Sequence, residues 1–578
     1  MTAALRAEER AAPYLVAPLL TDQLDTFASA PEGFKRLREL VLSLAVRGML
    51  VPQDPKDEPA DELLKRIAAE KRKLLATNSI RPEKALNEID DAESPFDIPG
   101  NWRLVRLQEL AWPQAGFAFK ANLFNEVGDG LPLIRIRDVG ADGPSTYYSG
   151  EYRDEFVVES GDWLVSMDGQ FRVAKWHGPR ALLNQRVSRL VFFGGETQQR
   201  LICIALQHEL LKLQGQKAYT TVDHLSGGQI ASRLIPLPPL AEQSRIVAKV
   251  EELMALIAAL EAKVGASGTA HSRLLDTLLA ALADSPDATA TADAWAQLAP
   301  HFDLLLQTPA DVDRLQQTLL QLAVKGRLVP QDPKDEPAAE LLKRIRAEKE
   351  RLVAEGKIKR EKPLPSIIDN ELPFDVPGGW QWAKLGDVVI SSEAGWSPSC
   401  ESTPRESGKW GVLKVSAVSW GKFLDDENKA LPSHLKARPE CEVQPGDFLL
   451  SRANTAELVA RSVVAWNPDP QLMLSDKIIR LHIAARADKA YINLFNNSSF
   501  ARAHYVAKAS GTSASMKNVS REVVLSLPIP VPPAAEQSRI AAAVASLTAL
   551  CGRLRERLAT RRALSAKLAT ALTESALQ

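Results

Sequence analysis

The chain has 578 residues, of which 45% are hydrophobic and 25% are charged, and its formal net charge is −1. Because a single core rarely grows beyond about 250–300 residues, we expect several structural units. The sequence has no run of about 18 uninterrupted apolar residues, and charges at Glu8, Glu9 and Arg10 interrupt the stretch where a secretory signal needs its apolar core. We therefore expect a cytoplasmic protein without a membrane partner.

The near-neutral charge does not by itself indicate nucleic-acid binding, so any DNA-binding surface must be local. The four cysteines have no Cys-x-x-Cys spacing, which argues against a disulfide framework and against a structural zinc site. We expect no metal site on this chain.

Residues 1–33 share no repeat with the rest of the chain and are interpreted as an N-terminal extension, either flexible or in contact with a partner. The region 34–95 follows, and apolar periodicity predicts helices over 34–47 and 60–76. Its segment 50–71 returns 278 residues later with 20 of 22 positions identical. The chain therefore contains an internal duplication.

Two further motifs return and border an insert in each copy. PFDIPGNW at 95–102 returns as PFDVPGGW at 373–380, and PPLAEQSRI at 238–246 returns as PPAAEQSRI at 532–540. The segments between these motifs, which differ in length by 16 residues, resemble each other far less than their borders do. The near-identical repeated segments, which we call the frame, must satisfy the same partner or the same packing in both copies. The divergent inserts are free of this requirement, so they are expected to carry selectivity.

We define the first insert as residues 96–239 and the second insert as residues 374–533, and predict that each is a compact domain containing a sheet. Strand periodicity appears at 132–139 and 411–418, and turn-then-strand patterns appear at 161–166 and 446–451.

Each insert is followed by a long helical pattern, predicted over 240–284 and 534–578. The first has apolar residues at heptad spacing: Ile246, Val250, Leu253, Ile257, Leu260 and Val264. The second has Ile540, Val544, Leu547, Cys551, Leu554 and Leu558 with the same gaps. Leu274, Leu278, Leu568 and Leu572 are expected to extend the two seams. Two equal seams favour a coiled-coil stalk of two helices, although ordinary core packing remains open for either seam alone.

Residues 285–311, rich in Ala, Asp and Thr, are predicted to be a linker between the two copies. The region 312–373 repeats 34–95, with helices predicted over 313–325 and 338–354.

These motifs, in this order and twice over, resemble the specificity subunits of type I restriction-modification systems. The resemblance implies an α+β fold with an internal pseudo-twofold repeat. In that fold, two α/β target recognition domains are joined by long antiparallel helices that form a two-helix coiled-coil stalk. Each recognition domain would read one half of a bipartite site in double-stranded DNA.

The resemblance also implies partners and cofactors. Two methylation (M) subunits would dock on the helices, and restriction (R) subunits would join through them. S-adenosylmethionine would belong to the methylation subunits, and ATP and Mg to the restriction subunit, so no cofactor is expected on this chain.

Polar side chains in three pairs of segments are candidate DNA contacts. The strand pattern at 132–139 would turn Ile134 and Ile136 to the core and the intervening cations outward. Amides can bond adenine at two atoms, and arginine can fork onto guanine. The candidates are Arg135, Arg137, Ser166, Gln170, Arg172, Lys175, Gln185, Arg186, Lys414, Ser416, Ser451, Arg452, Asn454, Thr455 and Lys477.

Structural alternatives remain open for several candidates. The cations of 132–139 could form a solvated strand face, and Asn454 could serve a turn. Two hydroxyl-rich clusters, which contain Tyr219, Thr220 and Thr221 in the first insert and Ser513, Ser515 and Lys517 in the second, are weaker candidates for phosphate contacts.

Two rival functions must be weighed. A self-contained DNA-modifying enzyme is disfavoured, because Asn467-Pro468-Asp469-Pro470 lacks the aromatic ending of a methyltransferase tetrapeptide. Asp54-Pro55-Lys56 imitates half of a nuclease motif but lies in a Pro-rich turn. A coiled-coil protein-interaction scaffold is supported by the even charge, but it would not need divergent inserts. We therefore predict a recognition subunit without catalytic residues.

Overall fold

The computed structural model describes residues 24–83, 86–87, 89, 93, 96–141, 143–214, 225–360, 364, 367, 372–419, 421–511 and 516–577. The chain divides into two compact units, Met1–Ser267 with Arg561–Gln578 and Gly268–Thr560. The interpretations placed on residues 1–23, Pro95, Tyr219, Thr220, Thr221, Ser513 and Ser515 lie outside the described residues.

The helices predicted from periodicity are confirmed. In the first copy they are α4 (Gly33–Val46), α5 (Ala60–Ala76) and α8 (Leu240–Ala283), and in the second they are α11 (Pro309–Val324), α12 (Ala338–Ala354) and α17 (Ala534–Ser575). A proline occupies the N-cap position of both α5 and α12, Pro59 in the first and Pro337 in the second. Its ring fixes φ where each helix begins.

The two ends of the first insert pair with each other. Its first strand, β1 (Arg103–Arg106), pairs antiparallel with its last, β11 (Leu234–Leu237). Between them lie a four-stranded sheet in the order β2-β10-β7-β8 and a five-stranded sheet in the order β3-β5-β4-β9-β6. The bounds are β2 (Ala111–Ala115), β3 (Phe124–Asn125), β4 (Leu131–Ile134), β5 (Tyr147–Tyr148), β6 (Val157–Val158), β7 (Trp163–Ser166), β8 (Val173–Lys175), β9 (Ala181–Leu183) and β10 (Val187–Phe192).

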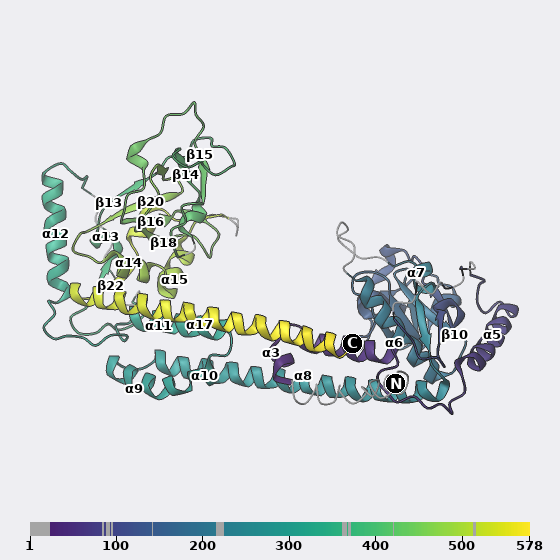
Figure 1. The fold of residues 1–578 in the computed structure, drawn as a ribbon. Helices are drawn as coiled ribbons and strands as arrows, with labels where there is room; N and C mark the ends of the chain where they lie inside the picture. Colours follow the sequence, from purple (N-terminus) through teal and green to yellow (C-terminus); the bar gives the residue numbers. More distant parts are fainter. Residues whose placement is uncertain are drawn as a thin grey trace. The chain divides into compact units, whose positions relative to one another are not determined.

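Helices α6 (Glu196–Leu213) and α7 (Gly227–Ala231) complete the first insert (Figure 1). Its main core joins β7 and β10 to α6 through buried residues that include Val165, Leu190, Ile202 and Leu206.

The second insert has the same order of strands. Its end strands β12 (Gln381–Lys384) and β22 (Pro528–Val531) pair antiparallel, and the sheets β13-β20-β16-β18 and β15-β14-β19 match β2-β10-β7-β8 and β5-β4-β9. A further pair, β17-β21, is added. The bounds are β13 (Val389–Ala394), β14 (Gly411–Leu413), β15 (Asn428–Ala430), β16 (Asp447–Ser451), β17 (Ala453–Asn454), β18 (Ser462–Ala465), β19 (Leu472–Met473), β20 (Ile478–Ile483) and β21 (Lys517–Asn518).

The α-helices described within the second insert are α13 (Leu385–Val388), α14 (Lys489–Asn496), α15 (Ser499–Lys508) and α16 (Arg521–Leu525). The parallel pair of the first insert, β4 with β9, also has its counterpart in β14 with β19. Two segments that diverge in sequence therefore fold with one topology.

The first unit contains a helical cluster, defined here as the core that joins α4 to α8 and α17. Leu37 and Val41 of α4 pack with Ile246 and Ile257 of α8, and Ala569 of α17 is completely buried among them. Helix α3 (Leu24–Ser29) joins this cluster through the buried ring of Phe27, so the predicted extension is packed at least from this ring onward.

The second unit contains the corresponding helical cluster. Leu315 of α11 packs with Cys551 and Leu558 of α17 and with Leu275 and Leu279 of α8. Helices α8 and α17 therefore each contribute one part to the first unit and another part to the second.

The predicted extension of the heptad seams is wrong at Leu274 and Leu568, whereas Leu278 and Leu572 are partly buried against the two helical clusters, as predicted. Leu274 and Leu568 are 52% and 48% exposed, whereas their neighbours Leu275 and Ala569 are buried. From Ile257 to Leu275 is 18 residues, which is five turns of a helix with 3.6 residues per turn. A strict heptad drifts away from this period, so the buried stripe moves by one position.

The predicted strand at 132–139 is also wrong in its second half. Strand β4 ends at Ile134, and the helix η4 (Ile136–Asp138) follows, which leaves Ile136 36% exposed. The reason is local, since the Asp138 carboxylate accepts the backbone N–H of Arg135 at 2.8 Å. In the second insert β14 likewise ends at Leu413, before the helix η8 (Val415–Val418).

Much of the segment predicted as a linker is helical. It contains α9 (Ala288–Leu298), the turn η6 (Ala299–His301) and α10 (Phe302–Leu305). Asp287 caps α9 by accepting the backbone N–H of Ala290.

One of the described helices, α8, is long and apolar enough to cross a membrane by length and composition. A single helix of this kind is weak evidence of a membrane span. Its buried residues pack into the two helical clusters, as the apolar stripe of a packing helix does.

Candidate nucleic-acid interface

Three turns of the first insert meet at one edge of its sheets, and we call them the first turn cluster: residues 135–137, 167–172 and 184–186. Strands β4 and β9 run parallel, so the residues that follow them lie together, and Asn184 N donates to Ile134 O at 3.3 Å. The second turn, 167–172, joins the third through a bond from Met167 N to Arg186 O at 2.9 Å. The fold thus gathers candidates that are far apart in the chain.

The first turn cluster presents amides and guanidinium groups to solvent. Gln170, Arg172, Gln185 and Arg186 are all exposed. Arg172 Nη2 donates to Gln170 Oε1 at 2.7 Å, and Arg186 pairs with Asp168 at 3.2 Å. These neighbours orient both guanidinium groups, which is the preorganisation that a two-point contact with a base edge needs.

Arg135 and Arg137 lie in the same cluster, but not as an outward strand face. Arg135 is half-buried, whereas Arg137 is exposed and donates to Thr146 Oγ1 at 3.0 Å. The two arginines therefore do not form a solvated strand face, which was the structural alternative for them, because strand β4 ends at Ile134.

The second turn cluster consists of residues 414–416, 452–455 and 475–477. Parallel pairing of β14 with β19 brings the first of these turns to the third, and Arg452 N donates to Lys477 O at 2.7 Å. Arg452 and Lys477 are exposed. The two clusters therefore occupy equivalent positions and offer different side chains.

Two candidates of this cluster share one acidic partner. Ser416 Oγ donates to Glu427 Oε2 at 2.5 Å, and Lys414 Nζ lies 3.7 Å from the same oxygen. A nearby carboxylate reduces the local positive charge, so this turn is less suited to a phosphate than the turn of Arg452.

The structure assigns structural contacts to several candidates. Ser166 and Ser451 are completely buried: Ser166 Oγ donates to Gln170 O and accepts from Arg172 N, and Ser451 Oγ donates to Leu458 O. Both hydroxyls hold their turns closed, so we correct their interpretation from DNA contact to turn support.

Asn454 and Thr455 are half-buried. The Asn454 amide donates to Ser419 Oγ at 2.9 Å and accepts the backbone N–H of Thr455, which is the turn role left open by the sequence.

Lys175 is not brought to the first turn cluster. It pairs in register with Trp163, at the opposite end of β7 from Ser166, and its ammonium group lies 3.2 Å from Glu196 Oε1. The prediction that Lys175 contacts DNA is therefore corrected, because its register in the hairpin β7–β8 places it at the opposite end from the turn 167–172.

Two guanidinium groups lie behind the turn that follows Asn454. Arg502 Nη2 donates to Ala456 O at 3.4 Å, and Arg461 donates to Asn497 O at 3.3 Å. Burial lowers the pKa of Arg461 and, together with the charge of Arg461, lowers the pKa of Arg502 to about 10. With a pKa of about 10, Arg502 stays protonated at neutral pH and adds a positive potential to this region.

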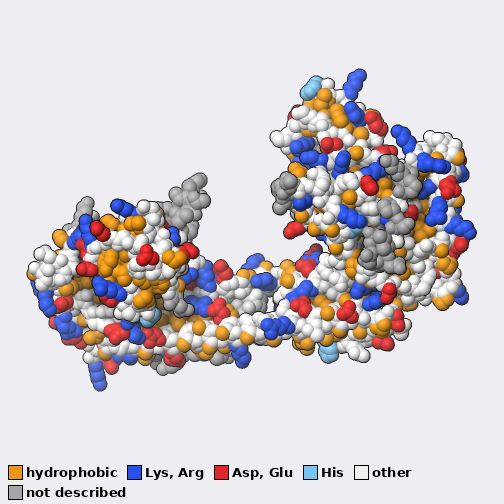
Figure 2. Space-filling model, turned by 180° about the vertical axis from the view of Figure 1, so that it is seen from behind, with side chains coloured by type: hydrophobic (Ala, Val, Ile, Leu, Met, Phe, Trp, Pro, Cys, Tyr) orange, Lys and Arg blue, Asp and Glu red, His pale blue; other side chains and the backbone are white. Residues whose placement is uncertain are grey.

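The wider surface is mixed. In Figure 2, Lys and Arg side chains are interspersed with Asp and Glu over the visible face of each unit. On this face the charges of both signs are interspersed and not gathered into one basic patch, in agreement with the net charge of −1.

The nuclease-like tripeptide is a turn, as predicted. Lys56 N donates to Asp54 Oδ1 at 2.9 Å, and Lys334 N donates to Asp332 Oδ1 at the same distance. The neighbouring acids Asp57 and Asp335 pair with arginines of α8 and α17. No group of three or more His, Cys, Asp or Glu suited to a metal ion occurs within the described residues.

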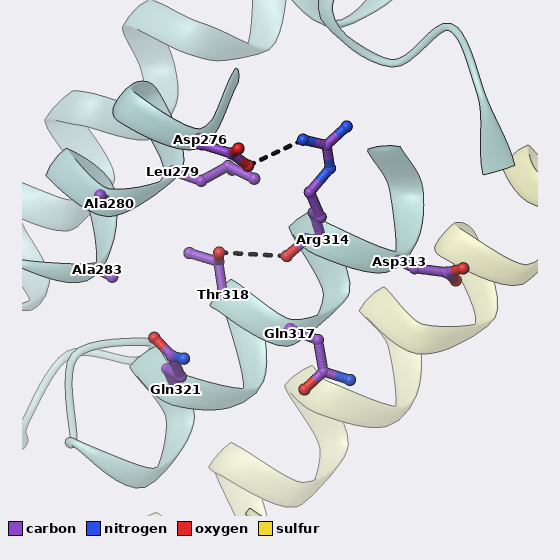
Figure 3. Close-up of a pocket in the computed structure, with 9 residues that line it drawn as sticks. All are labelled: Asp276, Leu279, Ala280, Ala283, Asp313, Arg314, Gln317, Thr318 and Gln321. Atoms are coloured by element: carbon purple, nitrogen blue, oxygen red, sulfur yellow. Dashed lines mark hydrogen bonds and ion pairs between the residues drawn. The ribbon is translucent and has the colours of Figure 1, made fainter. Parts of the chain in front are cut away.

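A shallow groove of about 330 Å³ lies between α8 and α11 in the second unit. Asp276 and Arg314 form an ion pair there at 2.9 Å, with Leu279 and Thr318 nearby (Figure 3). None of the DNA candidates lines this groove, so we do not assign it to recognition.

One element beside both clusters was missed by the sequence analysis. The equivalent strands β2 and β13 end at the first residue of two similar tripeptides, Ala115-Gly116-Phe117 and Ala394-Gly395-Trp396. Phe117 N donates to Leu183 O, and Trp396 N donates to Leu474 O, directly before the third turn of each cluster. The signal was the tripeptide Ala-Gly-aromatic, repeated 279 residues apart.

Two divergent inserts with one topology, which present different exposed amides and cations at equivalent turns, define a class of recognition protein with two reading domains. Residues 99–265 match the family model of the type I restriction modification DNA specificity domain. The EcoEI specificity subunit of Escherichia coli, a type I restriction enzyme subunit, is 37% identical over 97% of this chain and 100% of its own length. The EcoAI specificity subunit of Escherichia coli is 31% identical with the same coverage.

The chain belongs to the family of type I restriction enzyme specificity subunits. It is a DNA-specificity subunit and not a catalytic one. A solved chain from work on complex assembly and conformational transition of the type I R-M system covers 84% of this chain and 99% of its own length, with 17% identity and a TM-score of 0.45. A likeness at this level adds no argument, and the assignment rests on the two sequence relatives.

Proposed function

We propose that the chain reads a bipartite site in double-stranded DNA, with one half-site contacted by each insert. The observation that carries this proposal is the pair of turn clusters, which occupy equivalent positions in one topology but present different side chains. Residues 96–239 and 374–533 would be the two target recognition domains. Each mismatched base pair costs roughly 1–3 kcal/mol, so two linked readers multiply their discrimination.

Within the clusters, the exposed candidates are assigned to the DNA. Gln170, Arg172, Gln185 and Arg186 would serve the first half-site, with Arg135 and Arg137 beside them. Arg452 and Lys477 would serve the second, with Lys414 and Ser416 beside them. Asn454 and Thr455 would position Arg452 through their turn.

The long helices would set the distance between half-sites. We propose that α8 (within the predicted region 240–284) and α17 (within 534–578) form an antiparallel coiled-coil stalk, and that the two copies are related by a pseudo-twofold axis. The regions 34–95 and 312–373, joined through 285–311, would present two equivalent surfaces. Each surface would dock one methylation subunit, and restriction subunits would join through these partners.

The chemistry would reside in the partners. S-adenosylmethionine would be bound by the methylation subunits, and ATP with Mg by the restriction subunits, while this chain would hold no cofactor. The complex would act in the cytoplasm, where the DNA is. A protein-interaction scaffold remains the alternative, and salt-dependent binding to duplex DNA distinguishes the two.

The test is to co-express the chain with the methylation subunit of its system and to map methylated adenines by single-molecule sequencing. We expect two short fixed sequences separated by an unread gap. Exchange of residues 102–238 for the insert of a relative should change only one of the two. A motif that does not change with the insert would contradict the proposal and favour the scaffold.

A further inference from the structure

An aromatic ring lies beside each turn cluster and is held there by a glycine. A Cβ added to Gly116 would lie 2.2 Å from the carbonyl oxygen of Asn184, and one added to Gly395 would lie 2.0 Å from the carbonyl oxygen of Leu474. Only glycine lets the backbone approach the third turn of each cluster so closely. The residues that follow, Phe117 and Trp396, are therefore fixed next to the proposed reading turns.

Each ring carries an arginine on its face. Arg153 Cζ lies 5.9 Å from the centroid of Phe117, and Arg438 Cζ lies 4.3 Å from the centroid of Trp396. Both arginines hold the same place in the fold, immediately before the short helices η5 (Asp154–Phe156) and η9 (Pro439–Cys441). The pairing is thus kept in both inserts although the surrounding sequence differs.

The two arginines are accessible. The Arg153 side chain is 72% exposed, with Glu155 Oε1 at 3.6 Å from its Nη1, and Arg438 is also exposed. An arginine stacked on a ring retains its planar N–H donors for another partner and loses less conformational freedom when it binds.

We propose that Arg153 on Phe117 and Arg438 on Trp396 contact the DNA phosphate backbone at equivalent places in the two half-sites. This inference rests on the proposed function. Two domains that read different bases share only the sugar–phosphate backbone of their targets, and contacts to it set register without carrying sequence information. A feature kept in both inserts fits that shared backbone, whereas the divergent turns fit the bases.

The inference can be tested on the full chain assembled with its methylation subunits. Binding is measured to a duplex that carries the methylated motif and to an unrelated duplex, over about 50–200 mM salt. We expect Arg153→Ala and Arg438→Ala each to weaken binding to both duplexes by the same factor. Each should also reduce the slope of log K against log salt by about 0.9, the value for one phosphate contact. The methylated motif should stay unchanged.

Two further variants separate contact from packing. Trp396→Leu removes the ring and leaves Arg438, so we expect a loss of affinity in the same direction and smaller than that of Arg438→Ala. Arg486→Ala is the matched control, because Arg486 is an exposed arginine beyond the opposite end of β20 from Lys477, and it should leave the slope unchanged.

The outcomes are distinguishable. If the parent complex shows no salt-dependent binding to DNA, the proposed function itself fails. If the parent binds but both arginine variants keep its slope and affinity, the proposed function stands and this inference is overturned. A changed methylated motif would also overturn it, because the arginines would then read bases.

Discussion

The indole Nε1 of Trp102 donates a hydrogen bond to Glu242 Oε2 at 3.0 Å, inside the protein. Trp380 and Glu536 form the same bond at the same distance in the second copy. Each bond joins the motif that opens an insert to the motif that closes it, so the borders recognised in the sequence are in direct contact. Together with the pairing of β1 with β11, it fixes both ends of the first insert to one point of the frame.

Stability should depend on pH through Glu242. Burial raises the pKa of this carboxyl from 4.5 to about 7. Because the pKa is higher in the folded protein than in the unfolded chain, the folded state keeps a proton between pH 4.5 and 7 that the unfolded state loses. Stability therefore falls as pH rises through this interval and stays lower above it, by roughly 3 kcal/mol.

Glu242→Gln is expected to flatten this dependence, because the amide oxygen can still accept from Trp102. The variant should be more stable than the parent at pH 8 and similar to it at pH 5. The free energy of unfolding of the first unit is obtained from the urea dependence of its amide hydrogen exchange. The exposed Glu252→Gln is the control and should keep the parent's decline. A decline retained in Glu242→Gln would show that another group titrates.

Base reading should be divided between the two turn clusters. Arg172→Ala is expected to relax one fixed half of the methylated motif, and Arg452→Ala the other, at a cost of about 1–3 kcal/mol for each lost contact. Methylome sequencing of cells that carry each variant measures both effects. Lys175→Ala is the control, since its ammonium group pairs with Glu196 away from the cluster, and it should leave the motif intact. Relaxation of both halves by one substitution would argue against the division.

The helical cluster of the first unit should depend on a residue of α17. Ala569 is completely buried against α4 and α8, so Ala569→Asp places an unpaired charge in that core and is expected to destabilise the first unit by several kcal/mol. Hydrogen exchange of the α4 amides around Leu37 and Val41 measures this. Leu568→Asp, one residue earlier and 48% exposed, is the matched control with little effect. Equal destabilisation by the two substitutions would support the strict heptad seam, in which Leu568 belongs to the core.

Charge pairing should direct the first part of each long helix to one short helix, α8 to α4 and α17 to α11. Arg38 of α4 pairs with Glu261 of α8, and at the equivalent positions Arg555 of α17 donates to Gln316 of α11 at 2.8 Å and pairs with Asp313. The position of Glu261 is thus taken by Arg555 in the second copy and that of Arg38 by the neutral Gln316, so the start of α17 in the place of α8 on α4 would set Arg38 against Arg555.

Glu261→Arg is therefore expected to weaken the first helical cluster, and the double variant Arg38→Glu with Glu261→Arg to restore it. Because these side chains are partly exposed, the coupling free energy should be about 0.2–1 kcal/mol in a double-mutant cycle. No coupling would mean that apolar packing alone selects the partner.

The sequence predicted the elements whose information is local. The bounds of α5 and α12 follow from a repeated pattern after a proline, and the seams are correct as far as Ile257 and Leu558. They fail at Leu274 and Leu568, where the helical period of 3.6 overtakes the heptad. The strand at 132–139 fails because one side-chain bond, from the Arg135 amide to Asp138, ends it early.

The site depended on contacts that no spacing reveals. Parallel pairing of β4 with β9 brings Arg135 to Asn184, and hairpin register removes Lys175 from the cluster. Ser166 was chosen for its hydroxyl, but it lies at the buried end of a strand, and its hydrogen bonds are used by its own turn.

The sharing of α17 between the two units sets an order for biosynthesis. A ribosome releases α4, the first insert and the start of α8 long before it reaches Ala569, so the apolar stripe from Ile246 to Ile257 can pack on α4 first and receives the contribution of α17 only at the end of synthesis. A nascent chain that stalls within the second insert would therefore leave open the side of this cluster that Ala569 and Leu572 of α17 cover in the complete chain.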